Sequence, residues 1–154
     1  MNELNEIEYY ALPEKIVMAN THTEFLEKVF NHSRGTGGKA IFHYSKDVSV
    51  WMVEFDKVKE SWKNKTVKIN GVEYIREKYL GTESHPMHNG KPITVENVDG
   101  KTRLAVAIRK NGNTKTYNVL GVYTLDRKLS IDLNRLYKKI DLEDAKKLIP
   151  EAFI

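Results

Sequence analysis

The sequence predicts an α+β protein, built as a twisted antiparallel sheet or a small β-barrel of about six or seven strands with a helix near each end. Three Asn-Gly or Asp-Gly dipeptides, which favour tight hairpin turns, separate runs rich in β-branched and aromatic residues. Segments with a helical spacing of apolar residues flank this region at 21–32 and 141–149. Helices segregated from an antiparallel sheet define the α+β class.

The first expected helix covers residues 21–32. Thr21 or Thr23 can cap its N-terminus, and Glu24 suits the positive end of the helix dipole. Gly35 is expected to end the helix. The apolar face consists of Phe25, Leu26, Val29 and Phe30.

The second expected helix covers residues 141–149 and ends at Pro150. Its first residue, Asp141, is a favourable cap. Residues 129–140 come before it and fit two interpretations. Their apolar positions alternate like a strand in the first half and repeat like a helix in the second, so both interpretations stay open.

The pattern of β-branched and aromatic runs separated by turn residues predicts a β meander over residues 40–125. The run 48–55 is apolar on both faces, which predicts a central strand. The three hairpin turns are expected at Asn70-Gly71, Asp99-Gly100 and Asn111-Gly112, because asparagine, aspartate and glycine tolerate the positive φ of type I′ turns. A loop at 81–92 interrupts the meander.

Length and composition limit the class of protein. A chain of 154 residues fits one domain spanning 1–154. The absence of cysteine excludes disulfides, thiolate metal sites and a cysteine nucleophile. No apolar run is long enough to span a bilayer, and the first ten residues lack the apolar core of a signal peptide. We therefore expect a cytoplasmic protein without a membrane partner.

Charge is distributed unevenly along the chain. Residues 1–30 contain six acidic and two basic residues, a net charge of −4. The whole chain has a net charge of +4, so residues 31–154 have a net charge of +8. The acidic segment is concentrated in residues 1–20. A basic body attracts phosphate and favours nucleic acid as a partner, although a lysine-rich soluble surface would have the same composition.

A glycine-rich loop follows the first predicted helix and is flanked by two basic residues. Its backbone N–H groups can converge on an anion, and the flanking charges can add to that attraction. The same glycines would also serve as a helix cap and turn, and the spacing is not that of a P-loop. The candidate phosphate contacts are Arg34, Gly37, Gly38 and Lys39.

Basic and aromatic residues also occur together in the predicted strands. Bases stack on aromatic rings while arginine and lysine bind phosphates, so this mixture suits nucleic acid. The alternative is that most of the aromatic rings form the core. The candidate residues are Arg103, Arg109, Lys110 and Lys115 for phosphates, and Tyr44 or Trp51 for stacking.

Residues suited to metal or acid–base chemistry are few. His85 and His88 are separated by three positions, but no spacing predicts further ligands beside them. A nuclease could use Glu54, Asp56 and His43, although the spacing differs from a metal-nuclease pattern. The sequence therefore predicts no cofactor, no metal site and no catalytic residue, and it favours a protein that is not an enzyme.

Three short pieces resemble a known family when taken in order. They are Arg34-Gly-Thr-Gly-Gly-Lys39, Gly90-Lys-Pro-Ile-Thr-Val95 and the tyrosine-containing strand 116–125. This order resembles the SET-and-RING-associated group within the PUA-like superfamily, related modules of which occur on bacterial modification-dependent restriction enzymes. The resemblance covers residues 34–125. It implies a β-barrel that grips DNA and, in some members, takes a flipped modified base into a pocket.

The sequence supports three hypotheses about function. The first is a non-enzymatic nucleic-acid-binding module, with DNA as the expected partner, which uses the glycine-rich loop and a basic hairpin. The second is a phage or mobile-element inhibitor that blocks a bacterial defence protein through its acidic N-terminal segment. The third is a small metal-dependent nuclease.

Overall fold

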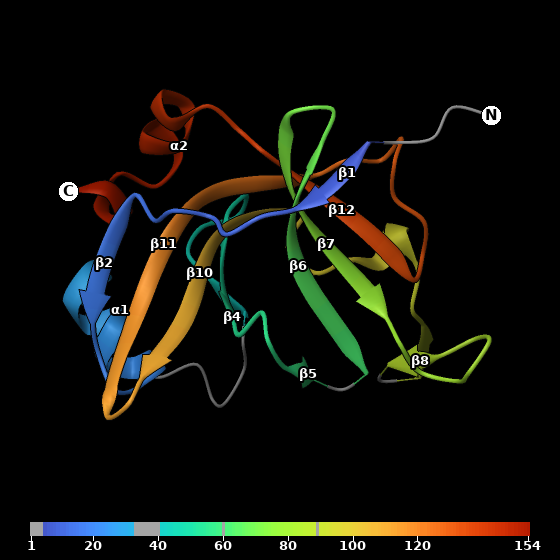
Figure 1. Ribbon diagram of the computed structural model, residues 1–154, viewed down its shortest axis with the longest axis horizontal. Helices are drawn as coiled ribbons and strands as arrows, with labels where there is room; N and C mark the ends of the chain where they lie inside the picture. The colour runs from blue at the N-terminus through green and yellow to red at the C-terminus, as the bar shows by residue number, and fades with distance from the viewer. Residues whose placement is uncertain (1–4, 33–40, 60, 89) are drawn as a thin grey trace.

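The computed structural model describes residues 5–32, 41–59, 61–88 and 90–154. It confirms the α+β class, with a mostly antiparallel, strongly twisted sheet and one α-helix near each end (Figure 1). The described part of the main sheet has ten strands, more than the six or seven expected, because short strands add to its edges. Its strand order runs as an open path rather than as a closed barrel.

The strands of the main sheet form the order β1-β6-β7-β12-β11-β10-β4-β3, with β2 paired to β11 and β5 paired to β6. A separate pair is formed by β8 and β9. Their bounds are β1 (Glu6–Glu8), β2 (Lys15–Met18), β3 (Ile41–His43), β4 (Ser49–Val53), β5 (Val58–Lys59), β6 (Trp62–Ile69), β7 (Val72–Tyr79), β8 (Met87–His88), β9 (Lys91–Pro92), β10 (Thr102–Asn111), β11 (Thr114–Leu125) and β12 (Asn134–Lys139).

Two of the three expected hairpins are present. The β6–β7 hairpin turns at Asn70-Gly71, and both residues have positive φ, at 52° and 81°. The β10–β11 hairpin turns one residue later than expected, because Asn111 still pairs with Thr114. The expected hairpin at Asp99-Gly100 is wrong: the segment before it contains the 3-10 helix η1 (Val95–Asn97) instead of a strand.

The sheet differs from a simple meander in two pairings. Strand β12, from the segment that the sequence left open, lies between β7 and β11 and joins the two hairpins into one sheet. Strand β4 pairs with β10 in parallel, and all five of its residues are buried, as expected for a central strand. As a result, the β6–β7 hairpin and the β10–β11 hairpin lie in one sheet but are separated by β12 (Figure 1).

A β-bulge bends strand β11 near its middle. Ala105 of β10 pairs with Gly121 and the next residue, Val106, pairs with Val119, so Leu120 is the extra residue. Gly121 has a φ of 140°, and a Cβ there would lie 2.9 Å from the Cε of Lys139. Glycine therefore lets β11 bend beneath the Lys139 side chain, which reaches Glu14 and Glu73.

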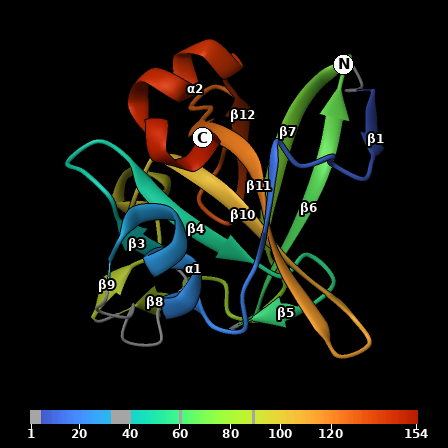
Figure 2. The same ribbon diagram turned by 90° about the vertical axis from the view of Figure 1, so that its left-hand side faces the viewer.

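The helices cover one face of the sheet (Figure 2). Helix α1 (His22–Phe30) is capped by Thr21, whose hydroxyl accepts a bond from the Glu24 amide. It ends at Asn31 in the left-handed conformation, not at the expected Gly35, which lies outside the described residues. Helix α2 (Leu142–Leu148) precedes the 3-10 helix η2 (Pro150–Phe153), which starts at the expected proline.

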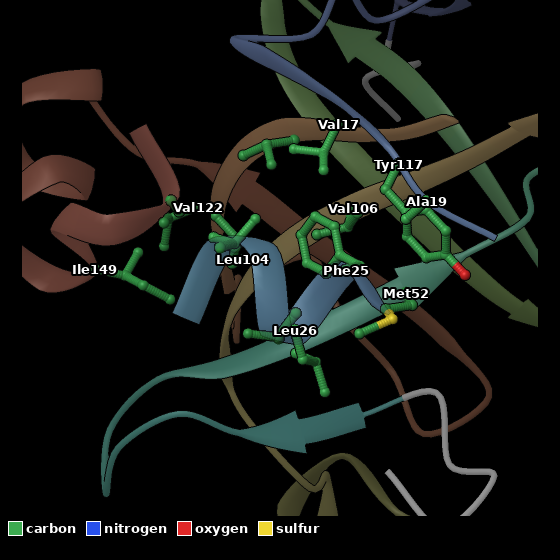
Figure 3. Packing of buried hydrophobic residues seen from close by; sticks show 14 of the residues in the cluster. Val17, Ala19, Phe25, Leu26, Met52, Leu104, Val106, Tyr117, Val122 and Ile149 are labelled. Atoms are coloured by element: carbon green, nitrogen blue, oxygen red, sulfur yellow. The ribbon is translucent and has the colours of Figure 1, made fainter. Parts of the chain in front are cut away.

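The main core lies between these helices and the sheet. Phe25 and Leu26 of α1 are fully buried in one cluster with side chains from β10 and β11 and with Ile149, which follows α2 (Figure 3). The ring of Phe25 stacks on that of Tyr117, with centroids 5.1 Å apart. None of the helices in the described part of the chain is long and apolar enough to cross a membrane.

Candidate nucleic-acid interface

A cleft of about 1020 Å³ opens on the side of the sheet away from the helices. Four segments that are far apart in sequence form its walls: residues 8–11, residues 54–57 after β4, residues 63–66 of β6, and the turn end of the β10–β11 hairpin. Figure 1 shows β6 and this hairpin as two arms with β4 and β5 between them. The twist of the sheet therefore creates a hollow that no single hairpin could form.

The cleft is rich in positive charge. Its lining contains five basic residues and three acidic ones. Two of the basic residues are paired: Lys57 Nζ lies 3.1 Å from Glu54, and Lys65 Nζ lies 3.7 Å from Glu8. Lys63 and Lys110 form no ion pair with any residue that the structure describes. The basic residues are Lys57, Lys63, Lys65, Arg109 and Lys110, and the acidic ones are Glu8, Glu54 and Asp56.

Arg109 joins the hairpin to the N-terminal segment. Its Nη2 donates to the carbonyl oxygen of Ala11 at 2.8 Å. Its guanidinium lies over the ring of Tyr10, with the Arg109 Cζ 4.0 Å from the ring centroid. The Tyr10 side chain is 69% exposed. A planar cation and an exposed aromatic ring therefore lie together at the wall of the cleft.

Polar side chains form the inner part of the cleft. Asn118 is buried, and its Nδ2 donates to the Ala107 carbonyl oxygen at 3.1 Å and to Thr116 Oγ1 at 2.9 Å. The Oδ1 atom of Asn64 is buried without a hydrogen-bond partner among the described residues. Burial and the nearby Glu73 carboxylate raise the pKa of Tyr9 to about 12, so this phenol stays protonated at neutral pH. These neutral groups are buried or already hydrogen-bonded, so they shape the inner wall of the cleft.

Of the basic residues predicted on the β10–β11 hairpin, Arg109 and Lys110 lie in the cleft. Lys115, which pairs with Lys110, is not part of the lining: its Nζ donates to the Asn20 carbonyl oxygen at 3.0 Å and lies 5.4 Å from the Tyr117 ring centroid. The structure therefore places Arg109 and Lys110, but not Lys115, in the lining of the cleft.

Arg103 and Trp51 are part of the core and are not exposed for contact with a ligand. Arg103 is 2% exposed and Trp51 is 4% exposed. The Arg103 guanidinium lies 4.6 Å from the Trp51 ring centroid and 4.7 Å from that of Tyr137. A DNA phosphate or base therefore cannot contact the Arg103 guanidinium or the Trp51 ring in this packing. Arg103 is therefore a buried cation held by aromatic rings.

Tyr44 lies on the helix-covered side of the sheet. Its hydroxyl donates to Glu151 at 2.7 Å, and its ring centroid lies 5.4 Å from that of Phe30. The structure therefore separates Tyr44 from the cleft. The predicted phosphate contacts of the glycine-rich loop, Arg34, Gly37, Gly38 and Lys39, lie outside the described residues.

The residues considered for nuclease chemistry do not come together. Glu54 and Asp56 line the cleft after the end of β4, whereas His43 pairs with Ser49 at the start of that strand. The imidazole of His43 lies 3.4 Å from Asp99 instead. Among the described residues, no group of three or more histidine, aspartate or glutamate side chains could hold a metal ion.

The acidic N-terminal segment is paired with the body of the protein. Glu6 forms an ion pair with Arg76, Glu8 with Lys65, and Glu14 with Lys139. Strands β1 and β2 also add to the sheet, beside β6 and β11. Much of the negative charge of the described part of this segment therefore faces basic residues of the same chain.

The sequence interpretation missed the cleft residues of β6. Lys63 and Lys65 are two positions apart, and this spacing could have indicated a basic edge on that strand. No sequence pattern indicates that Asn64 and Asn118 line the same cleft, because this depends on how closely β6 approaches the β10–β11 hairpin. That approach follows from the position of β12.

No family model matches the chain, and no curated protein matches it. A solved structure does match: the restriction enzyme AbaSI, described as specific for 5-hydroxymethylcytosine, with a TM-score of 0.55 and 16% sequence identity. The alignment covers 82% of this chain and 39% of the AbaSI chain. This protein therefore shares the fold of part of a longer enzyme.

Proposed function

We propose that this protein is a non-enzymatic DNA-binding module that binds the phosphate backbone in its basic cleft. The observation that carries the proposal is the convergence of Lys63, Arg109 and Lys110 from separate segments on one hollow beside the exposed ring of Tyr10. Cations that face a concave, partly apolar surface are suited to a polyanion with stacked or exposed bases.

The fold supports DNA as the nucleic acid. A protein with the same fold, AbaSI, is described as a restriction enzyme specific for a modified cytosine, and such an enzyme acts on DNA. This chain corresponds to 39% of that protein, so we propose only recognition for it and assign no cleavage. Contacts from Arg34, Gly37, Gly38 and Lys39 remain part of the proposal as sequence-based expectations.

Salt dependence of binding tests the proposal. Binding of a labelled DNA, followed by fluorescence anisotropy, should weaken as salt rises, with a slope of log K against log salt of about −0.9 for each phosphate contact. Lys63→Ala and Lys110→Ala should each weaken binding and reduce that slope by about one contact.

Lys147→Ala is the matched control, because Lys147 is an exposed lysine on α2. It should leave both the affinity and the slope unchanged. Binding that does not respond to salt, or an equal loss of affinity in all three variants, would contradict the proposal.

A further inference from the structure

A row of exposed apolar side chains borders the cleft, and nothing described so far explains it. Tyr10 is 69% exposed, Leu12 is 76% exposed, and Ile16 and Met18 are each 60% exposed. We call these four residues the apolar row. Neighbouring residues of the same segment, Ala11, Val17 and Ala19, are buried. This segment is therefore apolar on its outer side as well as on its inner side, which is unusual for a solvated sheet edge.

The pairing of β2 with β11 shows which way the row faces. Ile16 pairs with Asn118, and Met18 pairs with Thr116. Directly paired residues of an antiparallel ladder project from the same face of the sheet. Asn118 and Thr116 line the cleft, so Ile16 and Met18 lie on the cleft side of the sheet.

The other end of the row reaches the cleft itself. Tyr10 lines the cleft and lies over Arg109, and Leu12 follows Ala11, whose carbonyl oxygen accepts the hydrogen bond from Arg109. The apolar row and the basic cleft therefore meet at Tyr10, and Ile16 and Met18 lie on the same side of the sheet as the cleft, so we treat the row and the cleft as one surface.

We infer that this surface binds DNA whose bases are unpaired, with phosphates in the cleft and bases against the apolar row. The inference rests on the DNA binding proposed above and deepens it. A single strand presents charged phosphates along one edge and the faces of its bases along the other, which matches the arrangement of the surface. In a uniform duplex the bases are stacked inside, so the apolar row would face sugars and water.

Chemical complementarity favours this occupant over a protein. Three cations of the cleft form no ion pair with the described residues, namely Lys63, Arg109 and Lys110. They would attract a polyanion, whereas an apolar protein partner would gain nothing from them. Exposed tyrosine, leucine, isoleucine and methionine are also side chains that contact or separate bases in nucleic-acid complexes.

A competition experiment tests the inference. The intact chain is titrated with a fully paired DNA and with the same DNA that contains a central unpaired tract, at one salt concentration. We expect the DNA with the unpaired tract to bind about tenfold more tightly, because contacts to unstacked bases are available only in that DNA. Equal affinity for the two DNAs would overturn the inference.

Variants separate the apolar row from the cleft. Leu12→Ser combined with Ile16→Ser should abolish the preference for the unpaired tract and leave the salt slope unchanged. Ile131→Ser is the matched control, because Ile131 is 66% exposed and belongs neither to the apolar row nor to the lining of the cleft. Circular dichroism and thermal unfolding of each variant confirm that a loss of preference does not come from loss of the fold.

The outcomes distinguish the inference from the proposed function. Salt-dependent binding that is weakened by Lys63→Ala, without a preference for unpaired bases, would overturn the inference and leave the proposed function intact. Self-association of the chain in sedimentation that the row variant abolishes, with an unchanged preference for the unpaired tract, would assign the row to a second copy and also overturn the inference. Absence of any binding to either DNA would overturn both.

Discussion

The two faces of strands β4, β10 and β11 differ in what their side chains do. On the helix-covered face, β10 contributes large apolar residues, Leu104, Val106 and Ile108, which pack against α1. On the opposite face the same strand contributes Ala105 and Ala107. Both alanines are buried in a second core, so the sheet is packed on both faces at this level, and the cleft begins farther along β10, at Arg109.

The opposite face also contains the charged and polar groups. Trp51 and Tyr137 lie against the buried Arg103, which pairs with Tyr123, and farther along the strands the face becomes polar at Asn118 and Arg109. Burial raises the pKa of Tyr123 and of Tyr137 above the ordinary phenol value. The covered face is therefore packed along its length, whereas the opposite face changes along its length from core to open cleft.

The largest expected effect on stability is on the helix-covered face. Phe25→Ala removes a fully buried ring that stacks on Tyr117. We expect the free energy of unfolding to fall by about 4 kcal/mol, because the substitution loses apolar burial and leaves a cavity. Denaturant unfolding followed by circular dichroism measures this change. A loss similar to that of Ile131→Ala, which changes an exposed residue, would show that the helix does not stabilise the sheet.

The buried charges of the opposite face give the next largest effect. Glu77 lies 3.1 Å from Arg135 and 3.8 Å from Arg103, and both arginine side chains are almost fully buried. Glu77→Gln leaves two buried guanidinium groups without their carboxylate, so we expect a loss of about 3 kcal/mol in the free energy of unfolding. Urea titration of this variant measures the loss. A variant as stable as the original protein would mean that the aromatic rings and the carbonyl oxygens of Asp99 and Gly100 stabilise Arg103 without the carboxylate.

A smaller effect is expected on DNA affinity at the N-terminal wall of the cleft. Glu8 is paired with Lys65, and both side chains are largely exposed. Glu8→Gln frees a cation and removes a charge that repels phosphate, so DNA affinity should rise about two- to fivefold. Glu143→Gln on α2 removes the same charge far from the cleft and controls for net charge. An equal rise in both variants would exclude a local role for Glu8.

The smallest expected effect is the dependence of stability on pH at His22. Burial, together with nearby Lys115 and Lys59, lowers the pKa of His22, which is hydrogen-bonded to the Tyr117 hydroxyl at 2.8 Å. The unfolded chain binds the proton at higher pH than the folded one, so stability is complete above about pH 6.5 and falls as pH decreases below it. His22→Gln should flatten this dependence in thermal unfolding, whereas His85→Gln at an exposed position should not.

The local patterns in the sequence were sufficient to predict the class and most elements. Thr21 and the apolar face of residues 25–30 identify α1, and Asn70-Gly71 identifies the β6–β7 turn. These features depend on neighbouring residues only. The parallel pairing of β4 with β10 and the insertion of β12 depend on packing between distant segments, so no local pattern indicates them.

The same limit explains the site predictions. Arg109 and Lys110 lie in the cleft as expected for a surface hairpin, whereas Arg103 on the same strand is buried. Nothing in the spacing of these cations along the sequence distinguishes the buried Arg103 from Arg109 and Lys110 in the cleft. What separates them is Trp51 on β4 and Tyr137 on β12, which enclose Arg103 only once those strands pair. The cleft, likewise, exists only after β6 and β11 are brought into one sheet.

Mapping the DNA contact onto the two faces of the sheet tests the account most directly. Backbone amide chemical shifts of the isotope-labelled protein are followed while a DNA with an unpaired tract is added. We predict that the large shifts fall on residues 8–11, 63–66 and 108–111 and on β2, with little change on α2. Large shifts confined to the helix-covered face, around α2 and η2, would contradict the assignment of the cleft as the binding surface.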